Sequence, residues 1–111
     1  MPKALISAGT AFIQLTDHID YPESGVLSKI IWKSEQSQCS LFCLAAQTEI
    51  SEHTSTRNAT VQVLAGTGEL TLNSDTILLT PGVFVFMPAN APHALAADSN
   101  LAFVLTLSQI G

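Results

Sequence analysis

Residues 82–107 read GVFVFMPANAPHALAADSNLAFVLTL, and the apolar runs of this stretch, with the turns between them, decide the fold class. Three short apolar segments, 83–87, 93–97 and 101–107, are separated by PANAP and DSN. Proline fixes φ, and Asn and Asp side chains bond to their own backbone, so both separators predict turns. Short apolar segments bounded by such turns are typical of β-strands.

The same pattern continues toward the N-terminus, where further strands are predicted at 26–33, 39–46, 59–65, 69–72 and 76–79, and another strand is predicted to end at His53. Turns separate these segments at a spacing close to about 8 to 12 residues, and no long helical stripe interrupts them. The sequence therefore predicts an all-β, antiparallel domain. A chain of 111 residues fits one compact domain. We expect this domain at residues 24–111, after an irregular arm or short helix at residues 1–23.

Composition and charge exclude several classes of partner. Apolar residues make up 47% of the chain and charged residues 12%, which predicts a folded globule. Nine Asp and Glu outnumber four Lys and Arg, so the net charge is -5 and no basic cluster suits nucleic acid. No apolar stretch approaches the roughly 20 residues that span a bilayer, and residues 1–9 do not resemble a secretory signal. We therefore expect a cytoplasmic protein without nucleic-acid or membrane partners.

The two cysteines, Cys39 and Cys43, are predicted to be reduced. If both lie on one strand, four residues of rise separate their Cα atoms by about 13 Å, which is about twice the reach of a disulfide.

Two of the predicted strands are apolar on both faces, at 83–87 and 101–105. A strand that faces water on one side alternates apolar and polar residues, so a continuous apolar run indicates that both faces are covered. One face meets the interior of the domain. We expect a second copy of the chain to cover the other face in a homodimer; the alternative is that the N-terminal arm covers it.

Two of the three histidines are candidates for chemistry. His93 follows a turn held by Pro88 and Pro92, and His53 lies at the end of a probable strand. A fixed imidazole at a strand end suits a metal ligand or a proton carrier. His18 is interpreted as a surface residue.

The spacing of these histidines resembles the two motifs of the cupin family. The first motif is Gly, five residues, His-x-His, three or four residues, Glu, six residues, Gly. In this chain His53 takes the place of the first His and Gly66 that of the closing Gly, whereas Gln47, Ser55 and Ala59 replace the opening Gly, the second His and the Glu.

The second cupin motif is Gly, five residues, Pro, one residue, Gly, two residues, His, three residues, Asn. Gly82, Pro88 and His93 match it in register, whereas Asn90 and Ala97 replace its second Gly and its Asn. The resemblance covers roughly residues 24–107. It implies a double-stranded β-helix, the jelly-roll barrel of a small single-domain cupin, with antiparallel strands.

The resemblance also implies a site inside the barrel. A typical cupin holds a divalent transition metal with three His and one Glu, and His53 and His93 are the two of these ligands that this chain retains. Glu49, Glu52 and Asp98 are the carboxylates that could add an oxygen ligand. The predicted ligand pocket contains the residues at the two motifs and their neighbours: His53, Ser55, Ala59, Met87 and His93.

Three hypotheses of function follow. The first is a protein that binds a small molecule, with or without a weakly held divalent metal, in the barrel pocket. The second is a metal-dependent dioxygenase, isomerase or lyase that uses His53 and His93. The third is a structural dimer whose pocket is vestigial. Trp32, Phe42, Met87 and Phe103 are interpreted as core residues, although such side chains also line ligand cavities.

Overall fold

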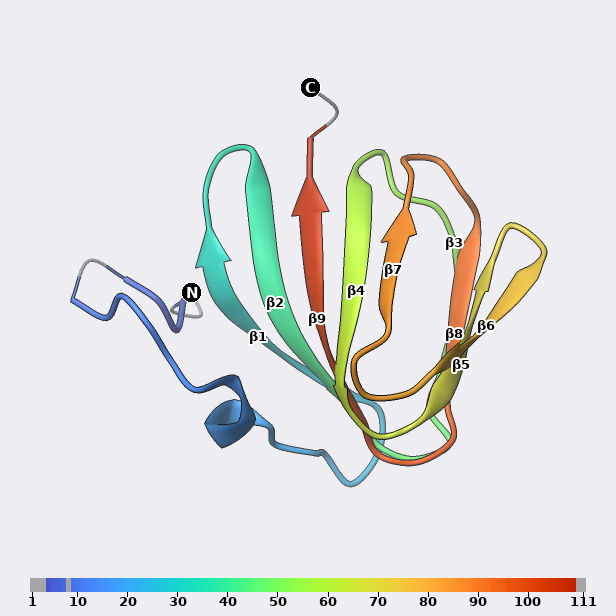
Figure 1. The fold of residues 1–111 in the computed structure, drawn as a ribbon, viewed down its shortest axis with the longest axis horizontal. Coiled ribbons are helices and arrows are strands. Elements are labelled where there is room, and N and C mark those ends of the chain that lie inside the picture. The colour runs from blue at the N-terminus through green and yellow to red at the C-terminus, as the bar shows by residue number, and fades with distance from the viewer. Residues whose placement is uncertain (1–3, 8, 110–111) are drawn as a thin grey trace.

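The computed structural model describes residues 4–7 and 9–109, and within them nine strands form two antiparallel sheets. One sheet has the order β1 (Val26–Lys33), β2 (Ser37–Leu44), β9 (Leu101–Ser108), β4 (Asn58–Ala65) and β7 (Phe84–Met87). The other has the order β3 (Glu49–His53), β8 (His93–Ala97), β5 (Gly68–Leu72) and β6 (Asp75–Leu79). The two sheets face each other as the halves of a jelly-roll barrel (Figure 1). This confirms the predicted all-β, antiparallel fold.

Apolar side chains that alternate along the strands point into the space between the sheets and form the core there. Leu44, Val61, Leu70, Leu79 and Leu101 are fully buried there. Strand β9 is apolar on both faces because Leu101 and Phe103 lie in the core between the sheets, whereas Ala102 and Val104 belong to a second apolar cluster on the other side of the sheet.

One predicted strand is displaced in the structure. The segment predicted at 39–46 forms a strand at Ser37–Leu44, because Ala45 and Ala46 belong to the turn that leads to β3. The Ala46 amide donates to Asn100 Oδ1 at 2.9 Å, and the Ala45 amide donates to the Gly25 carbonyl oxygen at 3.0 Å. These long-range bonds select the turn, and the hydropathy of the two alanines does not reveal them.

The four positions at which the cupin motifs have glycine all have a positive φ in this chain. Gly66 has a φ of 86° and Gly82 of 95°, and the two replaced positions, Gln47 and Asn90, have a φ of 69° and 70°. Glycine adopts this left-handed conformation without steric cost, whereas other L-residues are strained. Gln47 and Asn90 therefore adopt a conformation that glycine would adopt without strain.

Replacing Gln47 with glycine is expected to stabilise the protein. The left-handed conformation costs an ordinary residue roughly 1–2 kcal/mol, and the added freedom of glycine in the unfolded chain offsets roughly 0.4–1 kcal/mol of that gain. Gln47 Nε2 also donates to the exposed Asp98 carbonyl oxygen at 2.9 Å, a bond that the variant loses. We expect a net gain of about 0.5 kcal/mol in the free energy of unfolding, measured with urea. Asn90→Gly is the comparison, with a smaller gain expected because Asn tolerates this conformation.

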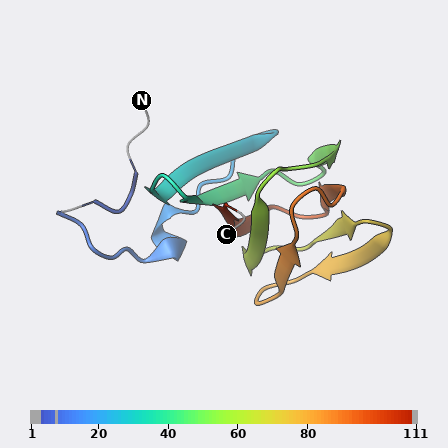
Figure 2. The same cartoon turned by 90° about the horizontal axis from the view of Figure 1, so that it is seen from above.

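The N-terminal arm covers the outer face of β1, β2 and β9. It contains a short 3-10 helix, η1 (Leu15–His18), and lies beside β1 and β2, away from the four-stranded sheet (Figures 1 and 2). Side chains of the arm pack against a second apolar cluster, which consists of Ile31, Leu41, Cys43, Ala102 and Val104. The sequence leaves two possibilities for the outer face of β9, a partner subunit or the N-terminal arm. In the structure the arm covers this face.

Backbone hydrogen bonds hold the arm in place. The amides of Leu5 and Ile6 donate to the carbonyl oxygens of Ile30 and Ile31 at 2.9 and 2.8 Å, so the start of the arm is bonded to the backbone of β1. The Asp20 amide donates to Cys43 Sγ at 3.5 Å. Partial burial raises the pKa of the neighbouring Tyr21 phenol, and Cys43 adds to this rise. The arm is therefore part of the folded domain.

The outer face of β7 is left open by the described part of the chain. Phe84 and Phe86 point outward and are 61% and 53% exposed, whereas Val85 and Met87 are buried in the barrel. The exposed apolar face of β7 is now the only one of the two predicted surfaces that supports a homodimer, and the homodimer stays a prediction. Cys39 and Cys43 are free, which confirms the prediction of reduced thiols. Among the described residues, no helix combines the length and the hydropathy that a membrane crossing requires.

Candidate functional site

Strands β3 and β8 bring His53 and His93 together. The two residues are paired across the strands, and their ring centroids lie 4.2 Å apart with an angle of 66° between the ring planes. The register of β3 shifts between Ile50 and His53, so both of these side chains reach the same cavity although they are three residues apart. Without such a bulge, an odd separation would direct them to opposite faces of the sheet.

The backbone fixes the orientation of both imidazoles. His53 Nδ1 lies 2.9 Å from the Ser51 carbonyl oxygen, and His93 Nδ1 lies 2.9 Å from the Ala91 carbonyl oxygen. A carbonyl oxygen only accepts hydrogen bonds, so each Nδ1 carries the hydrogen. In the neutral imidazole the free lone pair is then on Nε2. The site therefore holds two oriented Nε2 atoms that accept a hydrogen bond or bind a metal ion.

The histidine pair borders an apolar cavity of about 160 Å³ between the two sheets. His53 is exposed and His93 is half-buried, so the pair lies where the cavity meets solvent. The rings of Phe42 and Phe103 stack along one wall, with centroids 5.4 Å apart and an angle of 7°. The lining is otherwise formed by aliphatic and thioether side chains: Ile50, Val61, Leu70, Met87, Ala94, Leu95 and Leu105.

Of the predicted pocket residues, His53, Met87 and His93 line this cavity, and Ser55 and Ala59 do not. Ala59 is buried in the core opposite Met87 on the neighbouring strand. The carbonyl oxygen of Ser55 accepts a hydrogen bond from the Asn90 amide at 2.7 Å, so Ser55 braces the turn that precedes His93.

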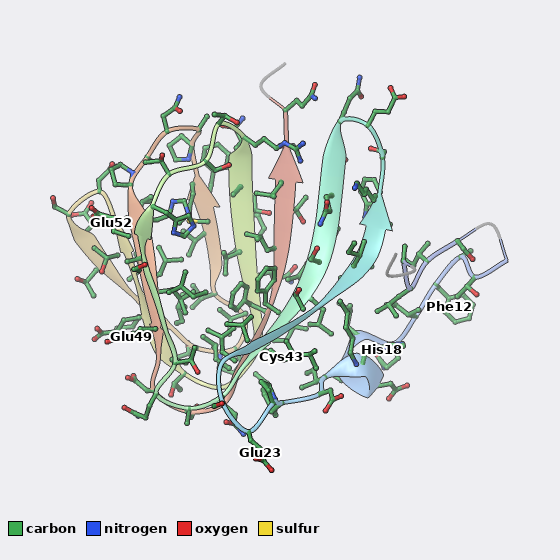
Figure 3. The ribbon with its side chains drawn as sticks, turned by 180° about the vertical axis from the view of Figure 1, so that it is seen from behind. Phe12, His18, Glu23, Cys43, Glu49 and Glu52 are labelled. Carbon is green, nitrogen blue, oxygen red and sulfur yellow. The ribbon has the colours of Figure 1, made fainter. Side chains whose placement is uncertain are left out.

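The carboxylates that were candidates for a third ligand lie away from the histidine pair. Glu49 and Glu52 are exposed, and neither points into the space between the sheets (Figure 3). The bulge in β3 breaks the shared parity of Glu49 and His53. Asp98 follows the opposite end of β8 from His93, and five residues of strand rise correspond to about 16 Å.

The residues of this site do not fit a resident divalent metal ion. Within residues 4–7 and 9–109, no group of three or more His, Cys, Asp or Glu side chains is placed to hold a metal. Open metal sites usually keep at least three protein ligands. The donors available here are the two Nε2 atoms of His53 and His93.

Comparison with known proteins identifies the family. The family model described as the cupin domain matches residues 40–108 of this chain, from Ser40 within β2 to the end of β9. The chain belongs to the cupin family. None of the curated proteins matches it.

Two solved structures are similar to this cupin over most of its length. A conserved protein of unknown function from Streptococcus pyogenes is 25% identical, with a TM-score of 0.85 over 100% of this chain and 96% of that chain. A cupin superfamily protein from Desulfitobacterium hafniense is 26% identical, with a TM-score of 0.82 over 88% of this cupin and 90% of that chain.

A salicylate 1,2-dioxygenase variant from Pseudoaminobacter salicylatoxidans, in complex with gentisate, shares the fold alone. It is 20% identical, with a TM-score of 0.71 over 76% of this cupin and 25% of that chain.

Proposed function

We propose that this cupin binds a small, largely apolar molecule that presents one hydrogen-bond donor to the Nε2 atoms of His53 and His93. The observation that carries the proposal is the pair of imidazoles, each with Nδ1 held by a backbone carbonyl oxygen, at the edge of an apolar cavity. Pockets that bind small molecules are mostly apolar with a few convergent polar groups, and this cavity has that composition.

The volume of the cavity limits the size of the group that it accepts. An apolar cavity of about 150 Å³ binds benzene in another protein. The cavity of this cupin, at about 160 Å³, therefore suits one six-membered ring. Phenol is the simplest probe that combines such a ring with a hydroxyl donor.

Phenol is expected to bind more tightly than benzene, and a double variant, His53→Leu with His93→Leu, is expected to remove this difference because it replaces both acceptors. Losing a hydrogen bond to a neutral partner costs about 1 kcal/mol, which corresponds to roughly a fivefold to tenfold change in Kd. NMR titration of the full chain with each probe measures the two affinities. The matched control is His18→Leu, because His18 lies in the N-terminal arm, outside this cavity.

Two results would contradict the proposal. One is equal binding of phenol and benzene in the unsubstituted protein, which would show that no acceptor contacts the hydroxyl. The other is the absence of binding of either probe, which would leave the cavity without a ligand role.

A divalent metal enters this proposal only as a weakly held ion that competes with the small molecule for the two Nε2 atoms. Two imidazoles alone hold a divalent ion weakly against water. Protein purified without an affinity tag is therefore expected to contain much less than one metal ion per chain. A stoichiometric metal that is lost in His93→Ala would instead support the metal-dependent enzyme.

A further inference from the structure

A second cavity, of about 220 Å³, lies against the inner face of the five-stranded sheet and adjoins the first. Phe42 and Leu105 line both cavities, so these two side chains form the partition between them. The wall of the second cavity differs from that of the first because it contains three polar side chains, Ser28, Gln38 and Ser40. Polar residues are unexpected on the inner face of a sheet whose other inward side chains are apolar.

The strand pairing explains how these polar side chains come to share one face. Ser28 is paired with Phe42, and Ser40 is paired with Leu105. On β2, Gln38, Ser40 and Phe42 follow one another at intervals of two residues, so their side chains point to the same side of the sheet. Ser28 points to this side as well, because it is paired with Phe42. Ser40 is only 5% exposed, which makes its hydroxyl a buried polar group next to the apolar core.

Gln38 and Ser40 have unused hydrogen-bonding capacity. Gln38 Nε2 donates to Ser40 Oγ at 3.2 Å, and this is the only side-chain bond that either residue makes to the described residues. The hydroxyl hydrogen of Ser40 therefore remains as one donor, and the side-chain amide oxygen of Gln38 remains as one acceptor. A neutral group that both accepts and donates, such as a primary carboxamide, is complementary to this pair. A carboxylate is less suitable because it only accepts.

We propose that the ligand of this cupin is elongated, with its ring in the His53 and His93 cavity and a neutral polar end bonded to Gln38 and Ser40. This inference rests on the proposed function, since it extends the same ligand past Phe42 into the second cavity. The two cavities together exceed the lower limit of about 300 Å³ for pockets that hold drug-sized molecules, which neither reaches alone.

The test compares two series of para-substituted phenols on the full chain by NMR titration. One series has alkyl tails of increasing length, and the other has tails of the same lengths that end in a primary carboxamide. At the length that spans the partition, the carboxamide is expected to bind about tenfold more tightly than the alkyl tail, as for two added hydrogen bonds of modest net strength.

Gln38→Met is expected to reduce this tenfold gain to about threefold, because one of the two hydrogen bonds is lost. Phenol itself is expected to bind as before, which also shows that the variant is folded. The matched control is Gln62→Met, the same change at an exposed position on the outer face of β4, and it is expected to keep the gain.

The outcomes separate the two proposals. If phenol binds but the carboxamide gives no gain at any tail length, the second cavity is not a subsite and the proposed function stands. An undiminished tenfold gain in Gln38→Met would likewise overturn the role of this pair. If neither phenol nor any tailed phenol binds, the proposed function itself is wrong.

Discussion

Replacing Gly66 with alanine is expected to lower the free energy of unfolding by more than about 4 kcal/mol, at the extreme of single substitutions. A Cβ atom at this position would overlap the backbone carbonyl oxygen of Asn100 and lie 2.8 Å from the Cα atom of Leu101. Neither is the movable end of a side chain, so the start of β9 would have to shift. Gly66 also has a positive φ, which adds the strain of the left-handed conformation.

Gly25→Ala is the matched control for this prediction. Gly25 has a φ of 76°, but a Cβ atom there meets nothing within 4 Å. Its substitution carries only the conformational cost of roughly 1–2 kcal/mol. Urea denaturation of both variants measures the difference. If the two variants lower the free energy of unfolding equally, the close approach of Gly66 to Asn100 and Leu101 does not constrain the fold.

Removing residues 1–23 is expected to lower the free energy of unfolding by about 4 kcal/mol. The arm covers Ile31, Leu41 and Val104 on the outer face of the five-stranded sheet, and exposing a buried aliphatic side chain costs about 1.5 kcal/mol or more. The lower end of that range is used because the truncation also relieves the entropy lost in ordering the arm. Urea denaturation checks the stability, and sedimentation velocity checks whether the exposed face associates.

Two neighbouring residues separate the effect of packing from that of truncation. Ile13 packs against the second apolar cluster, the one on the outer face of the five-stranded sheet, whereas Phe12, the residue before it, is 84% exposed. Ile13→Ala is expected to be clearly more destabilising than Phe12→Ala. A truncated chain that stays monomeric and as stable as the parent would show that the arm does not cover a core.

The strands of this cupin could be predicted where burial follows period two and turn residues mark both ends. The segment 26–33 coincides with β1, and 93–97 coincides with β8. The prediction was displaced at 39–46, where the end of β2 depends on the hydrogen bond from Ala46 to Asn100. Contacts between residues so far apart in the chain leave no local pattern.

The histidine pair was visible in the sequence because the two motifs place His53 and His93 at matching positions. Their environment was not visible. The bulge between Ile50 and His53 decides which side chains of β3 enter the barrel, and a bulge cannot be read from the alternation of residue types. The apolar lining was partly recognisable, since residues such as Val61 and Leu70 occupy inward positions on predicted strands.

The place of β9 in the five-stranded sheet has a consequence for biosynthesis. Ribosomes deliver β2 and β4 long before β9, yet these two strands are joined only through it. A nascent chain that stops short of Leu101 holds its apolar strands without their shared neighbour, and such unpaired edges are prone to aggregation. Translation must therefore reach Ser108 before the five-stranded sheet closes, and until then the facing edges of β2 and β4 have no partner.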